Sequence, residues 1–264
     1  MEEPAYAKLN LALHVRAREP DGYHRIETLF AFCADGDLLS VEPSGRLALD
    51  VTGPFAGDLG AAEDNLVLRA ARMLGGGRGA ALRLDKRLPV ASGIGGGSAD
   101  AAAALRLLTR FWKLDVAEAE LLRIAAALGA DVPACLRSKT AAGEGRGDRL
   151  REIDAPNLSG RPALLVNPRV PLSTAAVFRA WDAVDRGPLG GWEDGRNDLE
   201  PPARALVPEI GAVLDALRGA RFARMSGSGA TCFGLYDDAA ARDADDARIA
   251  AAFPQWWRLA TRLR

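Results

Sequence analysis

The sequence predicts a mixed fold of strands and helices that is divided into two parts. Residues 5–53 alternate between apolar and polar positions, as half-buried strands do. Apolar residues take up helical spacing after residue 63, and a succession of strands and helices starts again beyond residue 155. Between these stretches, Pro156 and the run at 160–162 interrupt any regular element. We therefore expect two domains, at residues 1–157 and 158–264.

Strands open the chain. The expected strands are 5–15, 23–32, 37–43 and 47–53, with a turn at 20–22, and we expect them to pair as antiparallel neighbours. One face of the first strand is apolar, and the other carries Tyr6, Lys8, Asn10 and His14. A polar face on an alternating strand usually meets solvent.

Helices follow, and glycines mark several of their ends. The helices are expected at 63–77, 98–112, 117–129, 174–184, 208–219 and 241–253. The intervening strands are expected at 80–90, 162–168, 220–229 and 231–236, with a short last strand at the C-terminus and a glycine- and proline-rich break at 186–198.

Composition excludes several classes of protein. The chain has 264 residues, with 34 basic against 35 acidic side chains, so no net field attracts nucleic acid or a membrane. We find neither a secretory signal nor an apolar run long enough to span a bilayer, and we expect a cytoplasmic location. Cys33, Cys135 and Cys232 are too far apart for a zinc knuckle, and a disulfide framework does not fit three cysteines. With only His14 and His24, the chemistry has to rest on carboxylates, lysines and backbone groups.

Lysine is rare in this chain. Only four of the 34 basic residues are lysines, at Lys8, Lys86, Lys113 and Lys139, and the other 30 are arginines. We interpret the lysines that are kept as positions that need a compact ammonium group with an adjustable pKa and not a planar guanidinium.

The segment PVASGIGGGSAD, residues 89–100, is the strongest local motif. Glycines between a strand and a helix let backbone N–H groups face an anion, and the helix N-terminus adds partial positive charge. We interpret it as a phosphate-binding loop; a flexible surface loop is the alternative. Ser98 either caps the helix or contacts phosphate or magnesium, and Asp100 in the first turn complements the helix dipole. The glycine spacing fits neither a Walker A loop nor a Rossmann fingerprint.

Three polar residues outside this loop are further candidates. Lys8 and Asn10 lie two positions apart, hence on one face of the first strand, where they either face solvent or serve a site. Asp131 follows the glycine that ends a helix, and it either caps the next helix or accepts a hydroxyl proton. The spacing does not choose between these roles. A second glycine–serine turn at 224–236 is weak evidence when taken alone.

Taken together, these segments resemble the GHMP kinase family. The match runs in order through AYAKLNLAL, DGYHRIETLF, EDNLVLRAA, KRLPVASGIGGGSADAAAAL, LGADVPACL, GEGRGDRL, VPLSTAAVF, NDLEPPA and RMSGSGATCF. The glycine-rich loop marks the family as a whole. The AKLNL and DGYH segments are similar to the members that act on a cytidine diphosphate-linked sugar alcohol.

The resemblance implies an α+β fold of two domains, an N-terminal one like ribosomal protein S5 domain 2 and a ferredoxin-like C-terminal one. It implies phosphorylation of the 2-hydroxyl of 4-diphosphocytidyl-2-C-methyl-D-erythritol with ATP and Mg²⁺, in isoprenoid precursor biosynthesis. The enzyme is expected to be a monomer or homodimer with no nucleic-acid or membrane partner. The alternatives are a homoserine- or mevalonate-type kinase, a nucleotide-binding regulator without turnover, and an S5-like RNA binder.

The resemblance also implies roles for individual residues. Asp131 is expected to be the base and Lys8 its charge partner. The substrate is expected to contact Asn10, Tyr23, His24, Thr174 and Phe178, with the cytosine between the rings of Tyr23 and Phe178. ATP is expected to contact Asn65, Lys86, Pro89, Gly93, Gly95, Gly96, Gly97 and Ser98.

Overall fold

The computed structural model describes residues 1–59 and 65–264. The chain forms two compact units, each assembled from several segments. The first unit contains Met1–Lys8, Asp35–Val90 and Gly95–Ser138, and the second contains Leu9–Ala34, Ala91–Ile94 and Lys139–Arg264. Strands β1 (Glu2–Arg18) and β2 (His24–Glu42), which pair with each other, therefore each contribute residues to both units. The predicted domain division at residues 157 and 158 stays a prediction.

The sheet of the first unit departs from one expectation. Strand β4 (Ala80–Asp85) is antiparallel to residues 38–42 of β2, but β3 (Leu47–Thr52) pairs with β4 in parallel, not in the expected antiparallel sense. A parallel neighbour requires a long crossover connection. Here the connection passes through the short helix η1 (Ala56–Asp58) and then α1 (Leu66–Gly75).

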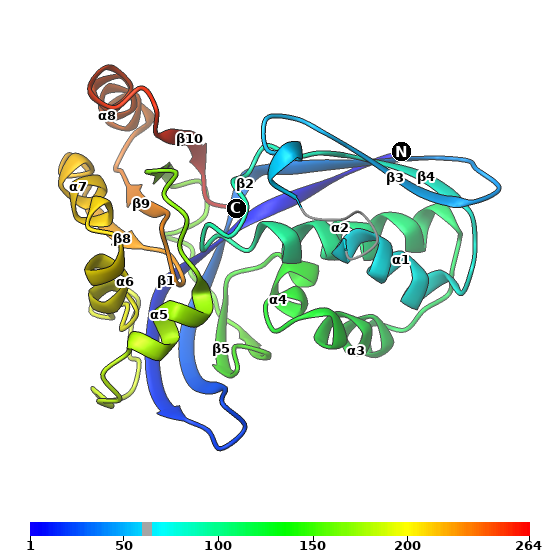
Figure 1. The fold of residues 1–264 in the computed structure, drawn as a ribbon, viewed down its shortest axis with the longest axis horizontal. Coiled ribbons are helices and arrows are strands. Elements are labelled where there is room, and N and C mark those ends of the chain that lie inside the picture. The colour runs from blue at the N-terminus through cyan, green and yellow to red at the C-terminus, as the bar shows by residue number, and fades with distance from the viewer. Residues whose placement is uncertain (60–64) are drawn as a thin grey trace. The chain divides into compact units, whose positions relative to one another are not determined.

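Four helices complete the first unit. Helices α1, α2 (Gly96–Phe111), α3 (Glu118–Leu128) and α4 (Val132–Arg137) pack against one another (Figure 1). The buried face of α2 is lined by alanines, whose small side chains allow neighbouring helices to approach closely. Gly76 ends α1 in the left-handed conformation, as its sequence predicts. Glu63 and Asp64, expected at the start of this helix, lie outside the described residues.

The second unit is built on an antiparallel sheet with the strand order β10-β7-β9-β8. Its strands are β7 (Pro162–Asn167), β8 (Phe222–Met225), β9 (Cys232–Leu235) and β10 (Trp257–Arg262). Helices α6 (Glu200–Leu206), α7 (Glu209–Ala216) and α8 (Ala239–Ala252) lie along one side of it (Figure 1). Apolar side chains of the sheet, these helices and β1 form the core.

A hairpin and a short helix complete the second unit. Strand β5 (Ala141–Gly145) is antiparallel both to β2 and to β6 (Arg149–Glu152). Helix α5 (Thr174–Ala180) ends four residues earlier than predicted, because Trp181 is extended and turns into the core. Helix α6 and this hairpin were not predicted, since elements this short leave little periodic signal in the sequence.

Three of the four polar side chains on this face of β1 are buried and Tyr6 is half-buried, so of the two alternatives left open for Lys8 and Asn10, exposure to solvent is ruled out. Asn10 and His14, in the second unit, are each 2% exposed, and Lys8, in the first, is 3% exposed. A buried polar group is stable only when it has partners. Lys8 pairs with Asp131, and the Asn10 side-chain amide donates to Thr28 Oγ1 at 2.8 Å.

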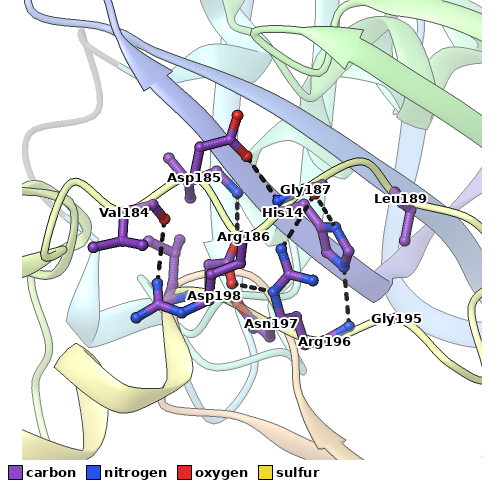
Figure 2. Close-up of polar contacts among 12 residues, drawn as sticks. His14, Val184, Asp185, Arg186, Gly187, Leu189, Gly195, Arg196, Asn197 and Asp198 are labelled. Carbon is purple, nitrogen blue, oxygen red and sulfur yellow. Dashed lines mark hydrogen bonds and ion pairs between the residues drawn. The ribbon is translucent and has the colours of Figure 1, made fainter.

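His14 holds a long connection against β1. Figure 2 shows the segment from Asp185 to Asp198 running beside the imidazole ring. The backbone N–H of Arg196 donates to Nε2 at 3.2 Å, so Nδ1 carries the proton and donates to the Gly187 carbonyl at 3.1 Å. The ring satisfies both contacts only when it is neutral. Burial, as the largest cause, lowers the pKa of His14 below its ordinary value and favours that form.

None of the helices in the described part of the chain combines the length and the apolar character that a bilayer crossing requires.

Candidate active site

The candidate acid–base pair is formed by two residues more than 120 positions apart, within the first unit. Lys8 Nζ lies 3.0 Å from Asp131 Oδ2. Asp131 occupies the N-cap position of α4, but its side chain makes no capping hydrogen bond. It is 35% exposed, whereas the lysine is buried, so the carboxylate can meet a ligand while its counter-ion stays in place. Of the two roles left open for Asp131, side-chain capping is therefore ruled out in this structure.

The glycine-rich loop leads directly into α2. Gly95 is the N-cap of that helix, with φ at +66°, a conformation that favours glycine. A Cβ at Gly95 would lie 3.0 Å from Lys8 Cε. The loop backbone therefore lies against the Lys8 side chain, and only a residue without a side chain fits there. The predicted strand–loop–helix arrangement is confirmed, with the helix starting at Gly96, two residues before its expected start.

Lys86 lies under the start of α2 in a buried cluster of three ionisable groups. Its Nζ contacts Asp37 Oδ2 at 2.5 Å and Asp100 Oδ2 at 2.8 Å. A Cβ at Gly96 would lie 3.0 Å from Nζ. The Lys86 ammonium is 1% exposed and occupied by carboxylates, so the structure gives it an internal role. Its predicted contact with ATP stays a prediction.

Asp100 was predicted only to complement the dipole of α2, but the structure gives it a different environment. It is buried and binds Lys86, and its second oxygen, Oδ1, has no hydrogen-bond partner among the residues that the structure describes. Burial, the largest cause, raises the pKa of Asp100 to about 8, and the second carboxylate of the cluster, Asp37, acts in the same direction. Lys86 acts in the opposite direction but does not cancel the effect of burial. This carboxyl group therefore holds its proton at pH values where an exposed aspartate is ionised.

The remaining ATP candidates of the first unit lie at the ends of its elements. Asn65 caps α1, its side-chain oxygen accepting from the Val67 N–H at 2.9 Å. Pro89 is buried in the connection between β4 and the loop, and Ser98 lies in the first turn of α2, where it is half-buried. Their predicted contacts with nucleotide stay predictions.

The predicted substrate residues fall in the second unit. The His24 ring packs against Phe178, with ring centroids 4.8 Å apart, and edge-on against Trp181 at 5.8 Å. Burial is the main cause that lowers the pKa of His24, so the ring is neutral at pH 7. Tyr23 is exposed at the tip of the β1–β2 connection, next to His24 in the chain.

Three other predicted residues of the second unit line its second glycine–serine turn, at 226–229. Thr174, the first residue of α5, lies 2.8 Å from Ser228, hydroxyl to hydroxyl. The Asn10 N–H donates to Ser226 Oγ at 3.1 Å, and that hydroxyl donates to the Gly93 carbonyl at 3.0 Å. Hydrogen bonds therefore connect this turn, which the sequence alone supported only weakly, to the candidates Thr174, Asn10 and Gly93.

Four polar residues that contact the predicted ones were not selected as candidates from the sequence. They are Asp37 and Asp100 in the first unit and Arg146 and Ser226 in the second. Asp37 and Asp100 had one signal in the sequence, the retention of lysine at position 86 in a chain that otherwise prefers arginine. Arg146 and Ser226 lie in glycine-rich turns, where the sequence does not tell which side chain points inward.

The arrangement of the first unit suits phosphoryl transfer. An ionised carboxylate beside a buried ammonium can accept a hydroxyl proton, and a glycine-rich helix N-terminus can hold phosphate groups. The described residues include no group of three His, Cys, Asp or Glu side chains that could hold a metal ion.

Comparisons with known proteins agree with this chemistry. Residues 65–139 match the family model of the GHMP kinases N terminal domain, and residues 182–255 match that of the GHMP kinases C terminal region. The chain belongs to the GHMP kinase family, a family of small-molecule kinases. The predicted resemblance and the α+β, two-domain fold class are confirmed.

Individual relatives show which members of the family this chain is similar to. The chain is 56% identical over 277 aligned residues to the 4-diphosphocytidyl-2-C-methyl-D-erythritol kinase of Rhizorhabdus wittichii, covering 99% of this chain and 94% of the relative. A crystal structure of 4-(cytidine 5'-diphospho)-2C-methyl-D-erythritol kinase is similar with a TM-score of 0.84 and 35% identity, covering 100% of this chain and 99% of the other. A crystal structure of mevalonate kinase, at 10% identity and a TM-score of 0.71 over 100% of this chain and 99% of the other, shares the fold.

Proposed function

We propose that this protein transfers the terminal phosphoryl group of ATP to the 2-hydroxyl of 4-diphosphocytidyl-2-C-methyl-D-erythritol, in isoprenoid precursor biosynthesis. The observation that carries the chemistry is the Lys8–Asp131 ion pair beside Gly95, the N-cap of the glycine-rich loop. The relatives at 56% and 35% identity support the choice of acceptor.

Asp131 is the proposed base. Its carboxylate is partly exposed and would accept the proton of the acceptor hydroxyl as the oxygen attacks the terminal phosphorus. In phosphoryl transfer the bond to the leaving group is largely broken before the proton leaves, so a carboxylate of ordinary basicity is sufficient. Lys8 holds this carboxylate in its direction, since its ammonium lies 3.0 Å away.

The loop from Gly93 to Ser98 is the proposed phosphate-binding element. The first backbone N–H groups of α2 have no partner within the helix and can donate to phosphate oxygens. Gly95, Gly96 and Gly97 let the phosphates approach the backbone closely, and Asn65, Lys86 and Pro89 complete the proposed nucleotide contacts.

Mg²⁺ is part of the proposal and would arrive with ATP. It prefers six oxygen ligands and commonly keeps phosphate oxygens and water, so it needs no cage of protein carboxylates. The Ser98 hydroxyl is the candidate contribution of the chain, and the ion would neutralise phosphate charge.

Recognition of the cytidine end is assigned to the second unit. The rings of Tyr23 and Phe178 would stack on the cytosine, each base–aromatic contact adding about 1–3 kcal/mol. His24, neutral at pH 7, would exchange a hydrogen bond with the edge of the base. Asn10 and Thr174 would contact the methylerythritol end.

The proposal also covers the domain division, the cellular location and the assembly of the protein. The two domains divide near residues 157 and 158, which is supported by the family matches ending at 139 and starting at 182. The protein works in the cytoplasm, and it is a monomer or a homodimer with no nucleic-acid or membrane partner. Fractionation of cells and light scattering of the purified protein test these statements.

A substrate panel tests the proposed function. Purified protein, ATP and Mg²⁺ are combined in turn with 4-diphosphocytidyl-2-C-methyl-D-erythritol, mevalonate and homoserine, and ADP release is measured. We expect turnover with the cytidine compound at a kcat/KM at least about a hundredfold above the other two, since recognition of a whole base is lost in them. Phosphorus NMR of the product should locate the new ester at the 2-hydroxyl. Preferred turnover of mevalonate or homoserine, or none with any acceptor, contradicts the proposal.

A further inference from the structure

Arg146, in the turn between β5 and β6, contacts the connection between β1 and β2. Its guanidinium carbon lies 3.7 Å from the centre of the Tyr23 ring, and its Nη2 lies 2.5 Å from Asp21 Oδ2. All these residues belong to the second unit. Arg146 stands between Gly145 and Gly147, whose φ angles of +73° and +93° shape the turn that presents it.

Asp21 ties the guanidinium and the Tyr23 backbone together. Its Oδ1 accepts from the Tyr23 N–H at 3.0 Å, while its Oδ2 accepts from Arg146. The Tyr23 carbonyl accepts from the Glu19 N–H at 2.7 Å, which closes the turn. The backbone at Tyr23 is therefore fixed by hydrogen bonds, and the ring is fixed by the cation stacked on it.

This contact decides how Tyr23 can be used. The residue is 54% exposed, and Arg146 lies over one of the two faces of its ring. An exposed tyrosine without such a contact moves among rotamers, and a ligand that stacks on it has to immobilise it. A planar guanidinium on the first face reduces that loss and leaves the second face for a ligand ring.

We propose that Arg146 is a positioning residue for base recognition, which holds the Tyr23 ring in the orientation that stacks on the cytosine of the substrate. The inference rests on the proposed function and deepens it. Arg146 contacts neither the base nor the phosphates in this account; it acts through Tyr23. Because its charge is paired with Asp21, the effect comes from stacking and order more than from attraction of the substrate diphosphate.

The alternative is a surface ion pair that contributes almost nothing. Arg146 and Asp21 are both about half exposed, and such pairs are commonly worth little. A role in positioning differs from that alternative in one measurable respect, because the effect of Arg146 has to disappear when the Tyr23 ring is absent.

The test is a double-mutant cycle on full-length protein with Arg146→Met, Tyr23→Ala and the combined variant. Methionine keeps an unbranched side chain of similar length but removes the charge and the plane. We expect Arg146→Met to raise the KM for the cytidine substrate about five- to tenfold, the value of one cation–ring contact with its ordering effect, with kcat and the KM for ATP unchanged. In the Tyr23→Ala background the same substitution should change the KM less than about twofold.

Two further variants sharpen the cycle. Arg146→Lys keeps the charge opposite Asp21 but loses the planar guanidinium. Its KM for the cytidine substrate should therefore rise nearly as much as that of Arg146→Met. Arg151→Ala removes another exposed arginine from the same hairpin and should leave all constants at wild-type values. An effect of Arg146→Met that is equal with and without the Tyr23 ring, that is absent, or that affects ATP as much as the cytidine substrate overturns the inference. Failure of the wild type to use the cytidine substrate overturns the proposed function instead.

Discussion

The two units hold their candidate site residues by different physical means. In the first unit, Lys8 and Lys86 are buried ammonium groups, each facing a carboxylate at 3.0 Å or less. In the second unit, Tyr23 is an exposed ring ordered by an exposed arginine. Buried charges depend strongly on their partners, because an unpaired charge in an apolar interior is very costly, whereas exposed contacts contribute less each. Substitutions in the first unit should therefore have the larger consequences.

The largest effect on stability is expected at the start of α2. Gly95→Ala places a Cβ 3.0 Å from Lys8 Cε at a φ of +66°, and it should lower the free energy of unfolding by about 2 kcal/mol through strain and displacement of the lysine. Gly97→Ala is the matched control, since its Cβ would meet nothing closer than 3.7 Å. Urea denaturation measures both. Similar losses for the two variants would show that the close approach to Lys8 is unimportant.

A second effect should appear as a dependence of stability on pH. The pKa of Asp100 is about 8 in the folded protein against 3.8 ordinarily, so the folded state retains a proton that the unfolded state releases. Stability from this group is full below about pH 4 and is lost as the pH rises toward 8. Between pH 5 and 8 the wild type should lose about 1 kcal/mol or more relative to Asp100→Asn.

Thermal and urea unfolding at several pH values measure this difference. Asp115→Asn removes an exposed carboxylate from the same unit and should follow the wild-type curve. Parallel pH curves for the wild type and Asp100→Asn would mean that the cluster around Lys86 does not hold the proton.

The smallest effect is expected in the second unit, at His14. Its pKa is lowered, so the folded state stays neutral while the unfolded chain takes up a proton below about pH 6.5, and stability falls as the pH falls through that range. His14→Asn should remove this slope, which amounts to about 1 kcal/mol at most between pH 7 and 5. Differential scanning calorimetry measures it; an unchanged slope in the variant would assign the acid sensitivity to other groups.

The order and type of most helices and strands could be predicted from the sequence, because these elements are long and their apolar residues are periodic. The strand–loop–helix at residues 80–112 and helices α1 and α3 needed only local spacing and the glycines that flank them, and α8 needed local spacing alone. The parallel pairing of β3 with β4 was not accessible in this way, since pairing direction depends on where the crossover places the chain and not on alternation.

The site was predicted in part. The pairing of Lys8 with Asp131 was expected from the family resemblance alone, because spacing could not decide that they meet. The burial of Lys8 contradicts the ordinary expectation for a charged residue on an alternating strand. The partners of Lys86 were not accessible, because Asp37 and Asp100 are 49 and 14 residues away in the chain. The folded structure was needed to show that Lys86, Asp37 and Asp100 meet.

The central claim is that Asp131, held in place by its ion pair with Lys8, removes the acceptor proton. Its most direct test compares kcat with the cytidine substrate and the dissociation constant for ATP in the wild type, Asp131→Asn and Lys8→Ala, with Asp115→Asn as the exposed control. We expect kcat to fall about a thousandfold in both site variants, while ATP binding stays within about threefold and the control is unchanged. Turnover near the wild-type rate in Asp131→Asn would contradict the account.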